Sequence, residues 1–108
     1  MGQMFMNLTP HAVIVVNDYG DDTIIEPSGL VARINSKDMV IGHINGVPIT
    51  RKRFEEIEGL PQPEKNLYFI VSYMIAARCK DRDDLLVPNE LIKDRYGRVI
   101  GCRSLGKA

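Results

Sequence analysis

The sequence predicts a β-rich α+β fold: a small antiparallel barrel-like or sandwich sheet with one short helix. Two observations lead to this prediction. Short apolar runs alternate with turn clusters at spacings of about 8–12 residues, as in proteins built from many short strands. One longer apolar run, residues 66–79, changes half-way from strand formers to helix formers. With 108 residues and no linker or internal repeat, the chain is expected to form a single domain.

The first half of the chain is expected to be short strands joined by turns. Apolar runs predict strands over residues 4–8, 12–16, 23–25 and 30–34, and clusters of Asn, Asp, Gly, Ser and Pro predict turns over residues 17–22, 26–29 and 35–38. Asn45-Gly46 lies between two apolar runs and is the strongest hairpin signal, because the favoured turn needs positive φ at both residues. Pro48 would lie at an edge or a bulge. Residues 51–58 remain ambiguous, since Phe54 and Ile57 also fit a helical spacing.

The long apolar run is interpreted as a strand that leads into a helix. Residues 67–71 have strand composition, Ser72 is a candidate N-cap, and residues 73–78 are helix formers that end in a basic residue. A single helix over residues 67–79 is the alternative. This segment is mainly scaffold, and it brings Arg78 and the acidic loop of residues 81–84 to one end of the sheet.

The last part of the chain is polar and turn-rich. A short strand over residues 85–87 is expected to stop at Pro88-Asn89, and residues 90–93 are left open as its extension. Residues 94–97 form a turn that ends in Gly97, and residues 98–103 form the closing strand. Strands that follow one another through short turns favour antiparallel pairing.

Charge and cysteine content exclude several classes of protein. The 14 basic and 14 acidic residues cancel, which argues against a surface made for duplex nucleic acid or an anionic membrane. The first residues have no basic segment followed by a long apolar one, so no signal peptide is expected, and no run is long enough to span a bilayer. Cys79 and Cys102 lack the spacing of a zinc site and are expected to be free thiols in the cytoplasm, although a disulfide between them stays open. No cofactor or metal is expected.

The candidate ligand-binding residues are mostly arginines. Arg82, Arg95, Arg98 and Arg103 lie close together in the sequence, and a guanidinium group reads phosphate through its planar fork. Asp83 and Asp84 would orient these arginines or accept hydrogen bonds from a ribose or a base, and His11 completes the candidate set. The alternative is a solvated loop in which Arg82 pairs with one aspartate, and a turn histidine that bonds to backbone.

Other motifs point to no chemistry. There is no P-loop, no nucleophile elbow around Ser28 and no metal-binding histidine spacing, so an enzyme is not expected. A catalytic site would need His11 near residues 81–84. Four aromatic residues could stack on a base, but core positions are the commoner use of such side chains: Tyr68, Phe69, Tyr73 and Tyr96.

Six segments spread over nearly the whole chain are distinctive together: Asn7-Leu-Thr-Pro-His11, Pro27-Ser-Gly29, Gly59-Leu-Pro61, Tyr68-Phe-Ile-Val-Ser72, Arg82-Asp-Asp-Leu-Leu-Val-Pro88 and Asp94-Arg-Tyr-Gly-Arg-Val-Ile-Gly-Cys102. Through them the chain resembles a family of small proteins from bacteriophages, prophages and bacteria that has no settled activity, cofactor or catalytic residue. The resemblance implies a small phage-type accessory protein in the cytoplasm of a bacterial host.

Three classes of function follow. The first is a non-catalytic accessory protein that binds and sequesters an anionic nucleotide-like host signal, an anti-defence role. The second is a protein–protein interaction module that inhibits a host protein or assists virion assembly. The third, an enzyme, has the least support. The ligand residues could converge within one chain or across the interface of a homo-oligomer.

Overall fold

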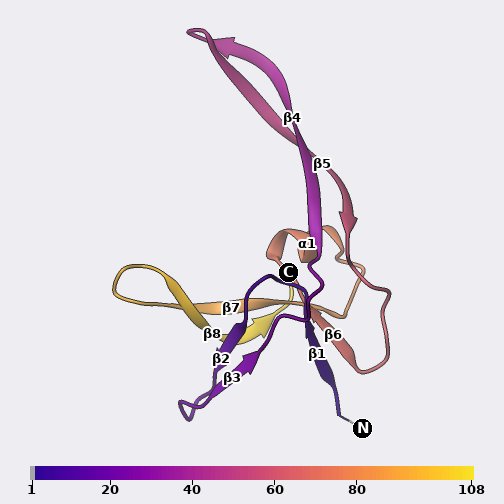
Figure 1. Cartoon of the computed structure of the whole chain (residues 1–108), viewed down its shortest axis with the longest axis vertical. Helices are drawn as coiled ribbons and strands as arrows, with labels where there is room; N and C mark the ends of the chain where they lie inside the picture. Colours follow the sequence, from indigo (N-terminus) through magenta and orange to yellow (C-terminus); the bar gives the residue numbers. More distant parts are fainter. Residues whose placement is uncertain (1) are drawn as a thin grey trace.

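The computed structural model describes residues 2–108, so that Met1 of the predicted domain lies outside it (Figure 1). Eight strands and one short helix occur in these residues, in the order β1 (Met4–Asn7), β2 (Val13–Val16), β3 (Asp22–Ile25), β4 (Arg33–Ile44), β5 (Val47–Glu58), β6 (Leu67–Ile70), α1 (Tyr73–Arg78), β7 (Leu85–Lys93) and β8 (Val99–Gly106). The β-rich α+β prediction with one short helix is therefore confirmed.

Six strands form one sheet in the order β1-β6-β7-β8-β2-β3, and β4 pairs only with β5. The six-stranded sheet is nearly closed, because its two edges meet at a parallel bridge between Asn7 and Pro27. A barrel-like sheet was predicted, but its purely antiparallel pairing was wrong. β6 pairs in parallel with both β1 and β7, and β2 pairs in parallel with β8. A short turn reverses the chain and gives antiparallel neighbours, whereas parallel neighbours need a longer crossover that returns the chain to the same end of the sheet; the segments that contain the arm β4–β5 and the helix supply such crossovers.

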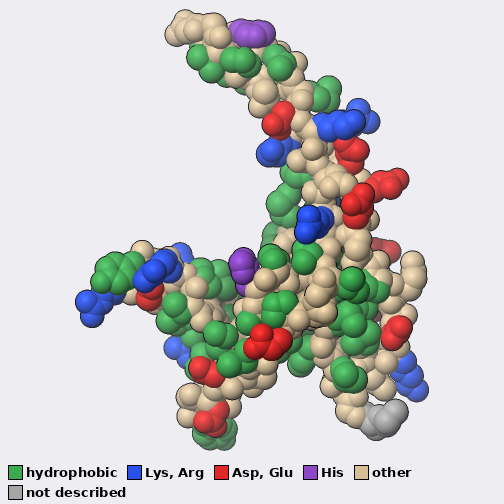
Figure 2. All heavy atoms as spheres, viewed as in Figure 1, with side chains coloured by type: hydrophobic (Ala, Val, Ile, Leu, Met, Phe, Trp, Pro, Cys, Tyr) green, Lys and Arg blue, Asp and Glu red, His purple; other side chains and the backbone are tan. Residues whose placement is uncertain are grey.

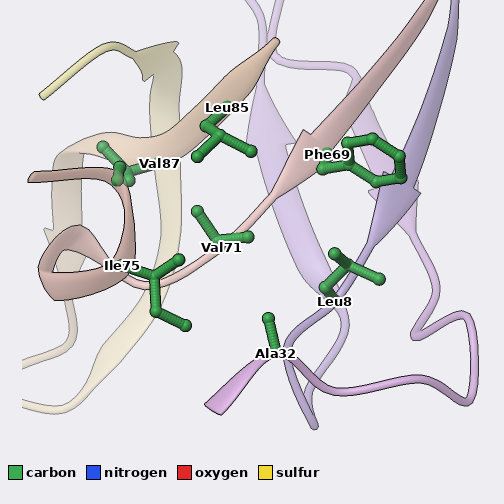
Figure 3. Close-up of a cluster of buried hydrophobic side chains, with 8 residues drawn as sticks. Leu8, Ala32, Phe69, Val71, Ile75, Leu85 and Val87 are labelled. Atoms are coloured by element: carbon green, nitrogen blue, oxygen red, sulfur yellow. The ribbon is translucent and has the colours of Figure 1, made fainter. Parts of the chain in front are cut away.

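Strand β6 lies between two core clusters because its side chains alternate between the two faces of the sheet. Phe69 and Val71 belong to the larger cluster, where they meet Leu8, Ala32, Ile75 and Leu85 (Figure 3). Ile70 belongs to the smaller cluster, with Val13 and Cys102. Burial of the apolar side chains on both faces makes β6 the centre of the fold.

The transition from strand to helix after β6 is confirmed. Ser72 is the N-cap of α1 in an extended conformation (φ −67°, ψ 156°), although its side chain makes no cap hydrogen bond. The helix buries Ile75 and Ala76 against the larger cluster. The alternative of one helix over residues 67–79 is wrong, because the backbone of residues 67–70 bonds to β1 and β7. No helix in residues 2–108 has the length and apolar character needed to cross a membrane.

The predicted hairpin at Asn45-Gly46 is confirmed, with φ of 50° and 78° at the two turn residues. Its flanking strands are much longer than predicted, since β4 and β5 each contain 12 residues. A separate strand over residues 30–34 and a turn over residues 35–38 are wrong, and residues 51–58, left ambiguous by the sequence, belong to strand β5. Polar residues such as Lys37 and Asp38 form strand here because the two strands project together into solvent, where both faces are wet (Figure 1).

The predicted stop at Pro88-Asn89 is wrong, because β7 continues to Lys93; residues 90–93, left open as an extension, do belong to this strand. Pro88 is opposite Leu105 in the antiparallel pair with β8, whereas β6 pairs with β7 only at Leu85 and Leu86. Beyond Leu86, the edge of β7 that faces away from β8 has no neighbouring strand. Pro88, which has no backbone N–H group, is tolerated there because no hydrogen bond to a neighbour is lost. The resulting β7–β8 hairpin extends to one side of the barrel (Figure 1).

Candidate functional site

The loop before β2 is organised by a buried side chain, Asn7. Its Nδ2 donates to the backbone oxygens of His11 (2.7 Å) and Ile25 (3.0 Å). Its Oδ1 accepts from the backbone N–H of Thr9 (2.9 Å) and from the Thr9 hydroxyl (2.6 Å). Asn7 is only 1% exposed, and these bonds satisfy both ends of its amide. The side chain thus holds the loop of residues 8–12 against the end of β3.

This loop forms one wall of an open hollow of about 650 Å³, and the β7–β8 hairpin forms the other. Its lining is mostly apolar: Ala12, Val13, Ile14, Pro88, Leu91, Val99, Ile100, Gly101 and Cys102, with Thr9 and His11 as the polar members. Val13 and Cys102 also belong to the smaller core cluster, so the hollow opens directly on the core. Its size and apolar character match those of small-molecule sites, which need few but well-placed polar groups.

Gly101 and Cys102 let the two walls approach closely. A Cβ atom on Gly101 would lie 3.1 Å from the backbone oxygen of Ile14, so a larger residue would push β2 away from β8. The Sγ of Cys102 contacts the same oxygen at 3.5 Å.

Both cysteines are free, so the prediction of free thiols is confirmed. Burial raises the pKa of the Cys102 thiol.

The turn that joins β7 to β8 carries two cations, Arg95 and Arg98. Asp94 accepts from the backbone N–H groups of Tyr96 (2.8 Å) and Arg98 (3.0 Å) and from the Nε of Arg98 (3.0 Å). The hydrogen bond from the Arg98 backbone N–H is the main cause of the lowered pKa of Asp94. The Arg98 guanidinium lies 5.4 Å from the centre of the Tyr96 ring, and Arg95 is exposed beside it. Arg98 directly precedes Val99, which lines the hollow.

Arg82 and Asp84 lie elsewhere, in the loop before β7. The Nε and Nη2 atoms of Arg82 donate to the two carboxylate oxygens of Asp84, each at 2.8 Å, and Nη2 also donates to the backbone oxygen of Pro61 at 3.0 Å. The hydrogen bond from Arg82 lowers the pKa of Asp84. Both side chains are largely buried, at 17% and 14% exposure, so this pair joins two loops and offers no free donor fork. Asp83 is exposed in the same loop.

The predicted residues therefore do not meet in one chain. Arg82, Asp83 and Asp84 precede β7, while Arg95 and Arg98 follow it, and a strand of nine residues is about 30 Å long. Arg103 follows Cys102, which points into the hollow, so the alternation of β8 directs Arg103 to the opposite face. Of the seven, His11 lines the hollow, and Arg98 directly precedes the lining residue Val99 in the hairpin turn that also holds Arg95. The ligand role of all seven residues stays a prediction.

The side chain of His11 has no hydrogen bond or ion pair with residues 81–84, where Asp84 pairs with Arg82. Within residues 2–108, no three His, Cys, Asp or Glu side chains lie close enough to hold a metal ion. Of the four aromatic residues considered, Phe69 is in the core, Tyr68 is half-buried, and Tyr73 and Tyr96 are exposed. Tyr96 lies in the hairpin turn, against the Arg98 guanidinium.

Sequence reasoning missed the apolar walls of the hollow and the length of the arm. Leu91, Val99 and Ile100 are residue types common in any strand, so the sequence does not mark them as exposed. Their exposure arises because the β7–β8 hairpin extends beyond its neighbours β6 and β2. No family model, no curated protein and no solved structure matches the chain.

Proposed function

We propose that this protein is a non-catalytic, phage-type accessory protein that binds and sequesters a small anionic nucleotide-like molecule, as an anti-defence protein would. The observation that carries the proposal is the hollow of about 650 Å³, which has mostly apolar walls with His11 among its lining residues and whose lining residue Val99 directly follows Arg98 of the hairpin turn. Pockets of this size and character suit a ligand with one flat apolar part and one anionic part.

The ligand's ring system would pack on Ile14, Leu91 and Ile100, because burial of the ring and of these side chains removes apolar surface from water. Its phosphate would face the hairpin turn, where Arg95 has no ion-pair partner among the described residues and Arg98 has one guanidinium edge free of Asp94. Charge-assisted hydrogen bonds of this kind are among the strongest available to a surface site. Arg82 is excluded from this role by its two bonds to Asp84.

Isothermal titration calorimetry on the full chain tests the proposal, with ADP-ribose and cyclic di-AMP as probes. We expect saturable binding of at least one probe, and a loss of about tenfold or more in affinity for the double variant Arg95→Ala/Arg98→Ala. Arg103→Ala is the matched control, because it removes a cation on the opposite face of β8. Absence of saturable binding for both probes would overturn the proposal.

Recovery of the ligand separates sequestration from catalysis. After incubation and heat denaturation of the protein, chromatography should return the nucleotide intact in the amount that was bound. A product that accumulates beyond one equivalent would show turnover, and the protein would then be an enzyme with His11 as the first residue to examine.

A second candidate function, a module that binds a host protein or a virion component, is favoured by the projecting arm β4–β5. Its distal half exposes apolar side chains to solvent, among them Met39 and Ile44 (Figure 2). Large exposed apolar patches commonly mark protein interfaces. A partner reconstituted from purified components, bound by the natural chain and lost with Ile44→Asp, would support this function.

A further inference from the structure

The arm β4–β5 is not supported by the rest of the chain beyond its base. Ile34 and Ile57 pack against the larger core cluster, and the Arg78 guanidinium lies 4.3 Å from the centre of the Phe54 ring. From there to the turn at Asn45-Gly46, the two strands pair only with each other (Figure 1). An isolated two-stranded hairpin is at best marginally stable in water. Burial of the arm's apolar side chains against another protein surface would stabilise the hairpin.

Both faces of the distal arm expose apolar side chains, with Val40 on one face and Met39, Ile44 and Val47 on the other. The register places Ile44 opposite Val47, Gly42 opposite Ile49, and Met39 opposite Arg51, and residues paired in this way point to the same side. Met39, Ile44 and Val47 are 49%, 63% and 58% exposed. This second face therefore presents a row of uncovered apolar side chains.

A second apolar surface of the same chain lies on the β7–β8 hairpin. Leu91, Val99 and Ile100 line the outer part of the hollow, and each is more than half exposed. The surface continues along β2 and β3, where Ile14 pairs with Ile24 and Ile24 is 56% exposed. Hydrophobic side chains are visible on both the arm and this hairpin, at the two ends of an open, hooked molecule (Figure 2).

The charges of the two surfaces are also complementary. Arg51 and Arg53 share the face of the arm that carries Met39, nearer its base, and neither is in an ion pair within residues 2–108. Asp18, Asp21 and Asp22 lie at the turn between β2 and β3, and they are likewise in no ion pair within the same residues.

The acidic turn lies beyond the end of β2 that is away from the hollow, since Val13 and Ile14 line the hollow and β2 ends at Val16. An arm that places its tip on the hollow and lies along β2 would direct its arginines, which are nearer its base, toward this turn.

From these observations we propose that the arm of one copy docks on the β7–β8 hairpin and β2 of a second copy. The tip side chains of Ile44 and Val47 cover Leu91, Val99 and Ile100 of the partner, and Met39, opposite Arg51, lies further along the arm. Each chain carries both an arm and a receiving surface, so two copies related by a two-fold axis exchange arms and leave neither surface open. This inference requires no ligand, but the docked arm covers Leu91 and Ile100, so arm docking and nucleotide binding in the hollow would compete.

The oligomeric state of the full chain in the absence of nucleotide tests the proposal. Light scattering after size-exclusion chromatography at about 100 µM should give a mass of twice 12.2 kDa or an even multiple of it. The variant Ile44→Asp/Val47→Asp should raise the dissociation constant by tenfold or more. His43→Asp is the matched control, because it adds a charge at the tip on the other face of the arm and should leave the mass unchanged. All three positions are exposed, so circular dichroism should show the same fold.

Cross-linking locates the contact. Two variants are mixed, one with Val47→Cys and one with Leu91→Cys, and both lack the natural thiols through Cys79→Ala/Cys102→Ala. We expect a disulfide-linked dimer of the two variants. Lys80→Cys used in place of Leu91→Cys is the control and should give no such dimer. A monomeric natural chain, association unchanged by the two aspartates, or equal cross-linking at Lys80 would each overturn the proposal.

Discussion

Arg82 and Asp84 form a two-point ion pair that also joins two loops. Nε and Nη2 of Arg82 each donate to one carboxylate oxygen of Asp84 at 2.8 Å, while Nη2 donates to the Pro61 backbone oxygen as well. Because the pair is largely buried, its removal leaves polar groups without partners. The residue expected to read a phosphate is thus a structural connection between the loop after β5 and the start of β7.

Arg82→Ala should lower the free energy of unfolding by about 1–3 kcal/mol, since it leaves the Asp84 carboxylate and the Pro61 oxygen unsatisfied. Urea denaturation followed by circular dichroism measures the change. Lys80→Ala, in the exposed part of the same loop, is the control and should have little effect. A change for Arg82→Ala no larger than that of the control would contradict a structural role.

The same pair predicts how stability depends on pH. Arg82 lowers the pKa of Asp84 in the folded state, so the ionised carboxylate stabilises the fold above its unfolded pKa of about 3.9, and this contribution is lost as pH falls through the lower folded value. The natural chain should therefore lose more stability below about pH 4 than Asp84→Asn does. Denaturation midpoints measured from neutral to acid pH test this, and parallel curves for the two proteins would disprove it.

Asn7→Ala should destabilise the protein by about 1–3 kcal/mol, because it leaves the backbone oxygens of His11 and Ile25 and the N–H of Thr9 without their partner in a buried place. Asn17→Ala is a matched control, since Asn17 accepts from the backbone N–H groups of Tyr19 and Asp21 in an exposed turn. Thermal denaturation should separate the two variants clearly. Equal effects would mean that burial at Asn7 contributes nothing.

Gly59→Ala should cost about 2–4 kcal/mol. Gly59 has φ of 78°, and a Cβ atom there would lie 2.5 Å from the backbone oxygen of Val31. Gly20 has almost the same φ, 80°, with no atom near its Cβ position, so Gly20→Ala isolates the backbone penalty of about 1–2 kcal/mol. Denaturation of the two variants gives the difference, and a smaller loss for Gly59→Ala than for Gly20→Ala would refute the close approach.

The two thiols should react at different rates. Cys79 is half-buried, whereas Cys102 is 2% exposed and has a pKa raised by burial, so less thiolate is available for reaction. A thiol reagent such as Ellman's reagent should modify one thiol quickly and one slowly in the folded protein, and both quickly in denaturant. Replacement of Cys79 by Ala should remove the fast phase; its persistence would show that Cys102 is accessible.

The sequence by itself determined the elements whose signals are local. The β-rich class, the turn at Asn45-Gly46, the strand over residues 67–70 and the helix after Ser72 follow from composition and turn chemistry, which act within a few residues. The strand over residues 85–87 was also predicted, but its continuation through Pro88 depends on which side of β7 lacks a neighbour.

Only the tertiary structure decided which strands pair in parallel, how far the arm extends and where the arginines lie. Pairing between β1 and β6, or between β2 and β8, joins segments far apart in the chain, and no local signal encodes it. Closeness in sequence suggested that Arg82 and Arg98 converge, yet an extended strand between them carries them to opposite ends of β7. Extended backbone separates neighbours in sequence, while sheet closure brings the Asn7 loop and the β7–β8 hairpin together around the hollow.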